Sequence, residues 1–144
     1  MKKSILIAFL FLSSLGFAQN WSTNIEEAKA KATAENKTIV LVFSGSDWCA
    51  PCIKLDKNVW QSEEFKAYAA EKLVLVRADF PKKKANVLPE ALQNSNKALA
   101  EKYNQEGYFP LVVVLNAQGK VIAKKGYENQ NADKYVAELQ ALIK

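Results

Sequence analysis

Residues 38–56 decide the fold of this chain, because the run Thr38-Ile-Val-Leu-Val-Phe43 is followed closely by Trp48-Cys49-Ala50-Pro51-Cys52. The first run is apolar and rich in β-branched residues, which predicts a buried β-strand. The residues after Cys52 have helical spacing and contain no helix breaker. Cys49 therefore lies at a strand-to-helix junction, near the first free N–H groups of a helix that stabilise a thiolate. We expect Cys52, about one turn further in, to be more shielded than Cys49.

Cys49 and Cys52 are the only two cysteines in the chain. Their spacing suits dithiol exchange, in which Cys49 attacks a disulfide and Cys52 resolves the mixed disulfide. A structural disulfide is one alternative, but closing so short a loop contributes only about 2 kcal/mol. A zinc site is another, but the chain has no histidine to complete a tetrahedral ligand set. We therefore predict a redox-active disulfide, with no metal and no other cofactor.

The first residues predict a secretory signal peptide. Met1-Lys2-Lys3 is basic, the following run to Leu12 is apolar, and small residues lead to Ala18. The apolar run is shorter than the ~20 residues that a membrane span needs. We predict cleavage after Ala18, leaving a domain of residues 19–144 without stable membrane insertion; an uncleaved anchor is the alternative. The protein is then exported, with periplasmic retention favoured over full secretion, into a compartment where disulfides persist.

Charge and length bound the class of protein. The formal net charge of +5 falls to +3 when the signal peptide is removed, because it contains two lysines and no acid. This mild charge, without interleaved aromatic and basic residues, argues against nucleic-acid binding. The remaining length suits one domain with a real core.

The order of elements predicts an α/β fold. Apolar runs predict strands at 38–43, 73–78, 111–115 and 120–124, the last two as a hairpin. Helices are expected from Thr23 or Asn24 to about 35, from 50, from 63 to about 71 after a break at 58–60, over 96–103, and from Asn131 or Asp133. Residues 79–95 are polar. We expect a mixed sheet of about four strands flanked by helices, with the first two strands parallel and the hairpin adding an antiparallel edge.

With these features the chain resembles thioredoxin-fold proteins, and in particular exported bacterial thioredoxin-like thiol–disulfide oxidoreductases. The resemblance covers nearly all of residues 19–144 and rests on Trp48–Cys52, on Phe109-Pro110 before the third strand, and on Gly126 after the fourth. It implies that Pro110 is cis and faces Cys49, and that the backbone at Phe109 pairs with a substrate peptide. The implied substrate-binding residues are Trp48, Ala50, Pro51, Phe109, Pro110 and Gly126.

The chain departs from thioredoxins in its buried charges. Phe43 stands six residues before the first cysteine, where thioredoxins have an aspartate, and Leu75 takes the place of a lysine on the second strand. Lys57 replaces a helix-kinking proline. The resolving cysteine therefore lacks the usual proton acceptor, and an aspartate at position 43 is expected to speed resolution. The stretch from Asp79 to Pro110 is also much longer than in thioredoxin.

Several residues near the cysteines have two interpretations. Trp48 is either a core residue or, because of its size and N–H group, a substrate contact at the rim, which we favour. Asp47 is a turn or cap residue, or a proton relay near Cys52. Asp56, one turn past Cys52, is expected on a solvated face. Lys82-Lys83-Lys84 predicts a solvated loop, or a patch that steers an acidic partner.

The residues between the cysteines bear on the direction of electron flow. Ala50 and Pro51 carry no charge, Pro51 removes one N–H donor, and Asp47 adds nearby negative charge. All three favour a potential nearer ~-270 mV than ~-120 mV. We therefore predict a disulfide reductase or exchanger for exported proteins, whose partners are protein disulfides and an electron-donor dithiol protein. The alternative is a thioredoxin-fold peptide-binding or chaperone-like module with a non-catalytic disulfide.

Overall fold

The computed structural model describes residues 19–144, so the predicted signal peptide lies outside the described residues. The described chain contains five strands and five α-helices, together with a π-helical turn, η1, and a short 3-10 helix, η2. Their bounds are β1 (Trp21–Ser22), α1 (Ile25–Glu35), β2 (Thr38–Ser44), α2 (Ala50–Leu55), η1 (Asp56–Trp60), α3 (Glu63–Lys72), β3 (Leu73–Asp79), η2 (Lys84–Asn86), α4 (Glu90–Tyr103), β4 (Leu111–Leu115), β5 (Val121–Lys125) and α5 (Ala132–Leu142).

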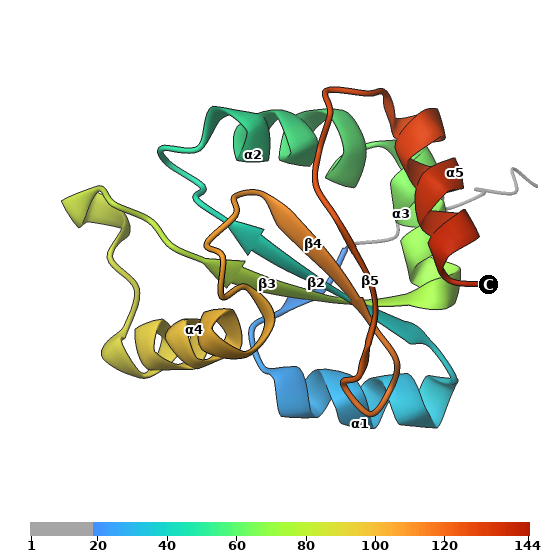
Figure 1. Ribbon diagram of the computed structural model, residues 1–144, viewed down its shortest axis with the longest axis horizontal. Coiled ribbons are helices and arrows are strands. Elements are labelled where there is room, and N and C mark those ends of the chain that lie inside the picture. Colours follow the sequence, from blue (N-terminus) through green and yellow to red (C-terminus); the bar gives the residue numbers. More distant parts are fainter. Residues whose placement is uncertain (1–18) are drawn as a thin grey trace, which may run out of the picture.

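The sheet has the order β1-β3-β2-β4-β5 (Figure 1). Strands β1, β3 and β2 are parallel, whereas β4 and β5 run antiparallel to their neighbours. This confirms the predicted α/β class, the parallel first pair and the antiparallel hairpin edge. Strand β1 is an addition to the four expected strands, because its two residues are too short to produce a hydrophobic pattern.

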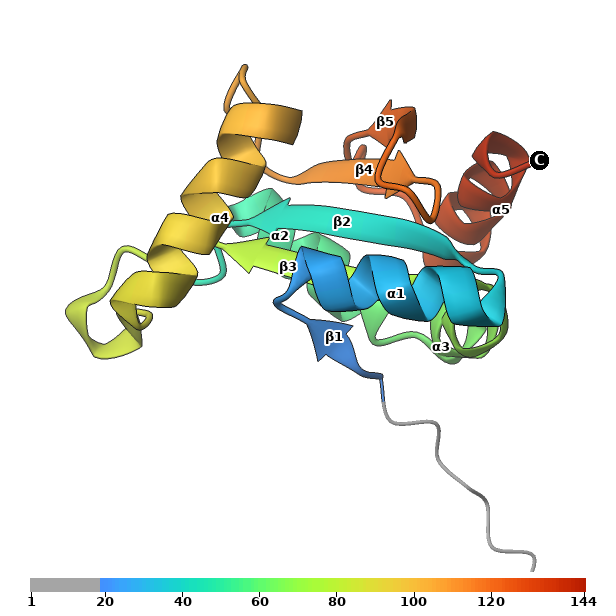
Figure 2. The same cartoon turned by 90° about the horizontal axis from the view of Figure 1, so that it is seen from below.

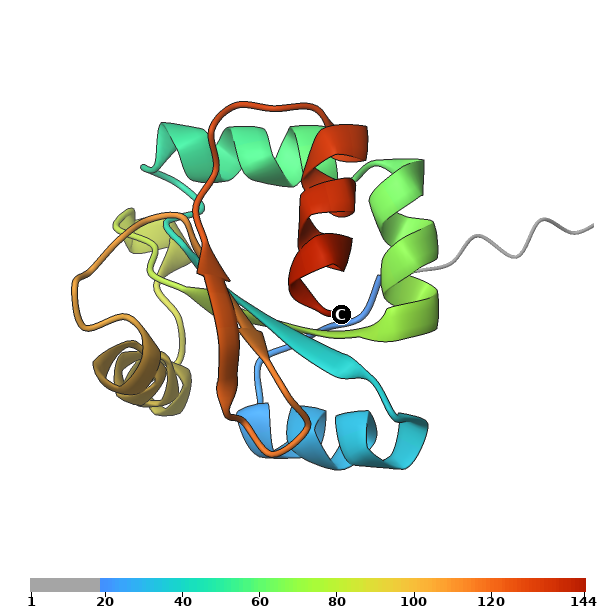
Figure 3. The ribbon, with the colours of Figure 1, turned by 45° about the vertical axis from the view of Figure 1, so that its right-hand side comes forward.

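Helices cover both faces of the sheet (Figures 1 and 3). Helices α2, α3 and α5 lie on one face, and α1 and α4 lie on the other. The side chains of β2 alternate between the two cores: Val40 and Val42 pack under the cysteine-bearing helix, whereas Leu41 and Phe43 pack toward α1 and α4. The central strand is thus buried on both sides, as its continuous apolar run indicates.

Short polar side chains begin the helices, as the sequence predicts. The Asn24 side chain accepts hydrogen bonds from the N–H groups of Glu26 and Glu27, at 3.0 and 3.2 Å. Ser62 caps α3, and Asn131 caps α5. Each satisfies backbone donors that the first helical turn leaves free.

The predicted break at residues 58–60 is wrong. The helix continues through η1 as a π-helical turn, in which the Gln61 N–H donates to the Asp56 carbonyl at 3.0 Å. Neither proline nor glycine interrupts this stretch. Val59 and Trp60 are buried, and their burial holds the wide turn against the core.

Helix α4 begins at Glu90, six residues before its predicted start at Asn96. Pro89 occupies the N-cap, a place that its fixed backbone angle tolerates. The first turns expose polar side chains to solvent, and this hides the helical period from a hydrophobicity pattern. No helix within residues 19–144 is long and apolar enough to cross a bilayer.

Candidate active site

Cys49 and Cys52 form a disulfide at the start of α2. Cys49 is the N-cap residue, and its sulfur accepts a hydrogen bond from the Cys52 N–H at 3.3 Å. Pro51 lies in the first turn and contributes no N–H group. A single backbone donor from the helix N-terminus thus reaches the Cys49 sulfur in the disulfide form.

Both cysteines are buried to nearly the same extent, at 4% and 3% exposed. Cys52 is the less exposed of the two, as expected, but only by this small margin in the disulfide form. As the cap of α2, Cys49 turns its sulfur back over the first helical turn instead of outward. The disulfide is bordered by exposed apolar side chains on α2: Ala50, Pro51 and Ile53, of which Ile53 is 48% exposed. Sequence analysis did not identify Ile53, which follows directly after Cys52.

Trp48 lies at the surface, 39% exposed, rather than in the core. Its indole N–H donates to the Phe80 carbonyl at 2.7 Å, and the Lys82 ammonium lies 3.9 Å from the ring centroid. The Trp48 ring also packs edge-on against Phe109, at 5.4 Å between centroids. These three contacts fix a half-exposed aromatic face next to Cys49, a position suited to substrate contact.

The Phe109–Pro110 peptide bond is cis, as the resemblance implies. Pro110 is buried and Phe109 is half-buried, with its ring against both Trp48 and Phe80. Gly126 lines a cavity of about 190 Å³ together with Tyr108 and Leu111, the residues on either side of Phe109-Pro110. The structure thus brings Trp48 and Phe109 together and gives Gly126 no described contact with them.

Asp47 holds the segment that follows β3. Its carboxylate accepts hydrogen bonds from the N–H groups of Lys82 and Lys83, at 2.9 and 3.0 Å, and from the Asn86 amide at 2.9 Å. The Lys82 N–H bond and the Asn86 amide hold the pKa of Asp47 below its ordinary value. An ionised, fully engaged carboxylate is a poor proton acceptor, so this geometry favours anchoring over a proton relay.

Residues 79–95, which we call the insert, start from a second polar anchor. The Asp79 carboxylate accepts hydrogen bonds from the Ser46 N–H at 2.9 Å and the Ser46 hydroxyl at 2.5 Å. Figure 2 shows the arrowheads of β2 and β3 pointing toward the insert and α4. Ser46, Asp47 and Trp48 thus attach the insert to the turn that carries the cysteines.

The register of β2 and β3 corrects the predicted positions of the missing charges. Val42, not Phe43, lies on the face beneath the cysteine-bearing helix, and its partner on β3 is Arg77, not Leu75. Arg77 pairs with Asp56 at 2.9 Å, so Asp56 is not simply a solvated residue. Counting back from Cys49 misplaces the residue by one because side chains alternate along a strand. The alternation of the β2 side chains between the two cores identifies Val42, and the continuous apolar run of the strand gave no such signal in the sequence.

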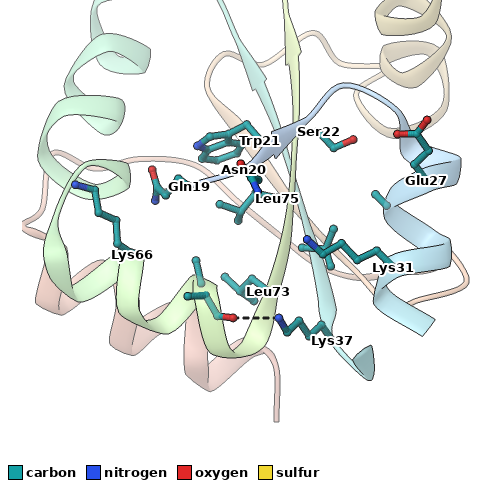
Figure 4. A pocket seen from close by; sticks show the side chains of 14 residues that line it. Gln19, Asn20, Trp21, Ser22, Glu27, Lys31, Lys37, Lys66, Leu73 and Leu75 are labelled. Carbon is teal, nitrogen blue, oxygen red and sulfur yellow. Dashed lines mark hydrogen bonds between the residues drawn. The ribbon is translucent and has the colours of Figure 1, made fainter. Parts of the chain in front are cut away.

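A cavity of about 730 Å³ lies away from the cysteines (Figure 4). It lies where β3 begins, at Leu73, whereas the cysteines follow the end of the parallel strand β2. Lysines at positions 31, 37 and 66 line it, and Lys37 donates to the Ala70 carbonyl at 3.0 Å. This cavity is separate from the cysteine site. Within residues 19–144, no cluster of metal-ligating side chains is present.

A disulfide of two cysteines three positions apart at the start of a helix, combined with a cis-proline before a later strand, is typical of thiol–disulfide oxidoreductases, and this chain is an enzyme of that class. Residues 20–117 match the family model described as Thioredoxin-like, and the chain belongs to that family.

Named relatives agree with this class. The chain is 38% identical over 118 residues to a Chlamydia pneumoniae protein named disulfide bond reductase DsbH, an alignment that covers 82% of this chain and 69% of the relative. It is 30% identical over 128 residues to the thioredoxin-related protein DsbJ of the same organism, with 84% of this chain and 36% of DsbJ covered. A solved DsbH oxidoreductase structure superposes with a TM-score of 0.78 at 35% identity, covering 88% of this chain and 86% of that one.

Proposed function

We propose that this enzyme reduces or exchanges disulfides of exported proteins and does not act as a primary oxidase. The observation that carries this proposal is the poor stabilisation of the Cys49 sulfur. Within residues 19–144 its sulfur accepts one backbone hydrogen bond, from the Cys52 N–H at 3.3 Å, and the intervening Ala50 and Pro51 carry no charge. A weakly stabilised thiolate makes the dithiol the better electron donor. The reductase name of DsbH supports the same direction.

The proposed reaction is two successive thiol–disulfide exchanges. The Cys49 thiolate attacks one sulfur of the substrate disulfide, forms a mixed disulfide and releases the other substrate sulfur as a thiolate. The Cys52 thiolate then attacks the Cys49 sulfur, closing the intrachain disulfide and releasing the reduced substrate. Two electrons pass from the dithiol to the substrate, and a donor dithiol protein returns them.

The apolar surface around the disulfide supports substrate binding. The residues that present it are Trp48, Phe109, Ala50 and Pro51, and we place the buried Pro110 beside them as the resemblance implies. We assign residues 1–18 as a signal peptide that is removed, so that the enzyme acts in the periplasm on exported proteins. The donor dithiol protein must then deliver electrons on that side of the membrane.

A redox titration tests the direction. Equilibrating the Cys49–Cys52 pair with glutathione buffers is expected to give a potential near ~-270 mV, and a value above about -150 mV overturns the reductase proposal. The Cys52→Ser variant is expected to accumulate mixed disulfides through Cys49. The matched Cys49→Ser variant should accumulate none; adducts there instead would reverse the two assignments.

A peptide-binding module is the second candidate function, and the burial of both cysteines favours it. The exposed Trp48 and Ile53 would then bind unfolded segments without chemistry. Peptide binding by a variant with serine at both positions, combined with no disulfide exchange by the unmodified protein, would establish this alternative.

A further inference from the structure

The insert and α4 enclose a cavity of about 450 Å³ next to the cysteine site. Its walls include four apolar side chains: Phe80, Pro81, Val87 and Leu88. We propose that this cavity is a substrate subsite that receives an aromatic side chain with a hydrogen-bond donor, such as tyrosine, from an acidic stretch of the substrate polypeptide. This inference rests on the proposed function, because it concerns the substrate of the same dithiol.

Phe80 links the cavity to the surface around Cys49. Phe80 belongs to both: it lines the cavity, its carbonyl accepts the Trp48 indole N–H, and its ring packs edge-on against Phe109 at 5.5 Å between centroids. A substrate chain that crosses Trp48 and Phe109 therefore meets the cavity on its way along the surface. The subsite extends the same binding surface.

The cavity is shaped before a substrate arrives. Three hydrogen bonds to the Asp47 carboxylate fix one side of the insert, and the Asn96 amide donates to the Asp79 carbonyl at 2.9 Å on the other. A preformed site loses less conformational entropy on binding than a mobile loop.

Asn96 gives the cavity a polar feature. It lines the cavity, is 1% exposed, and its Oδ1 accepts no hydrogen bond from any residue that the structure describes. A buried acceptor without a donor is unfavourable, so a ligand that supplies an O–H or N–H group is favoured over a purely aliphatic one.

The surrounding charge selects an acidic segment. Lys82, Lys83 and Lys84 in the insert and Lys97 on α4 form no ion pair within residues 19–144. Asp47, Asp79 and Glu90 keep their negative charges, because the donors to Asp47 and Asp79 are neutral groups, so the four lysines exceed the nearby carboxylates by one charge. The rim is therefore net positive and attracts acidic residues that flank the bound side chain.

Peptide disulfides test the subsite. The protein carrying Cys52→Ser is reduced and mixed with short acidic peptides whose single cysteine carries 2-nitro-5-thiobenzoate, and release of this chromophore gives the rate of attack by Cys49. Tyrosine is placed at successive positions on either side of the peptide cysteine. At one register the rate at low peptide concentration is expected to exceed that of the alanine peptide by about tenfold. Exchanging the acidic residues for lysine, or adding salt, should reduce this gain.

Two matched variants test whether the rate gain of the tyrosine peptide arises at the cavity. Val87 is 64% exposed at the cavity, and Val87→Asp is expected to abolish the tyrosine-to-alanine rate ratio. Ile122, 46% exposed on β5, provides the control, because Ile122→Asp introduces the same charge away from the cavity and should retain the ratio. Equal rates for tyrosine and alanine at every register, or equal loss in both variants, overturn the subsite. Failure of the unmodified protein to reduce the small substrate glutathione disulfide overturns the proposed function instead.

Discussion

Gly45→Ala is expected to displace the Trp48 indole from the rim of the cysteine site. A Cβ atom at position 45 would lie 2.3 Å from Trp48 Cε2 and 2.6 Å from its Nε1, well inside van der Waals contact. Gly45 also accepts the backbone N–H of Cys49 at 2.9 Å, so the turn resists moving away. The indole must therefore yield, although Phe80, Phe109 and Lys82 all hold it.

The contacts that Trp48 loses set the magnitude. Its hydrogen bond to the Phe80 carbonyl contributes about 1 kcal/mol, its edge contact with Phe109 about 1 kcal/mol, and the Lys82 ammonium over its ring about 0.5 kcal/mol. Part of this free energy is recovered when the indole ring repacks in a new position. We expect a loss of about 2 kcal/mol in the free energy of unfolding, within the range for overpacked sites.

Urea unfolding measures the loss of stability, and steady-state kinetics measure the loss of substrate binding. Gly126→Ala is the matched control, because a Cβ there meets nothing within 4 Å. The control should unfold with an unchanged free energy, whereas Gly45→Ala should lose about 2 kcal/mol. For Gly45→Ala the KM for a polypeptide disulfide should rise more than the KM for glutathione disulfide. Equal stability of the two variants, with a KM of Gly45→Ala for the polypeptide equal to that of the unmodified protein, would refute the inference that Trp48 is fixed and binds substrate.

Two further predictions concern charge near the cysteines. Hydrogen bonds lower the pKa of Asp47 in the fold, so its stabilising effect is present above its ordinary value of 3.8 and is lost as the pH falls through the lowered value. Asp47→Asn should therefore be less stable than the unmodified protein at neutral pH, with the difference shrinking in acid; a constant difference would contradict the anchoring role. The register of β2 also predicts that Val42→Asp, beside Arg77, speeds release of the mixed disulfide, whereas Phe43→Asp does not. Stopped-flow measurement of substrate release checks this, and a faster Phe43→Asp variant would contradict the assigned faces.

Local patterns predicted the elements that bury continuous apolar runs or start with a clear cap. The strands at 38–44 and 73–79 consist of such runs, and Asn24 begins α1 as its side chain suggests. The errors occur where local signals are weak. Strand β1 has two residues, and the first turns of α4 are polar, so neither produces a period that the sequence displays.

The cysteine pair was predictable because two neighbouring residues carry the whole signal. The surroundings were not, because their contacts join residues far apart in the chain. Asp47 binds Lys82 and Asn86 across 35 and 39 residues, and Trp48 binds Phe80 across 32. No local propensity encodes such pairs. The role of Asp47 therefore stayed open between a cap and a relay until its partners were known.

One turn supports both the chemistry and the binding surface, yet the two are separable. The hydrogen bond to the Cys49 sulfur comes from the Cys52 N–H within α2, and no residue of the insert contributes to it. The insert instead attaches through Ser46, Asp47 and Trp48, which precede the cysteines. Substitutions in the insert should therefore change the KM for polypeptide substrates while leaving the reduction potential of the dithiol unchanged. We therefore expect the insert to affect the selectivity of this thioredoxin-like domain without altering its electron chemistry.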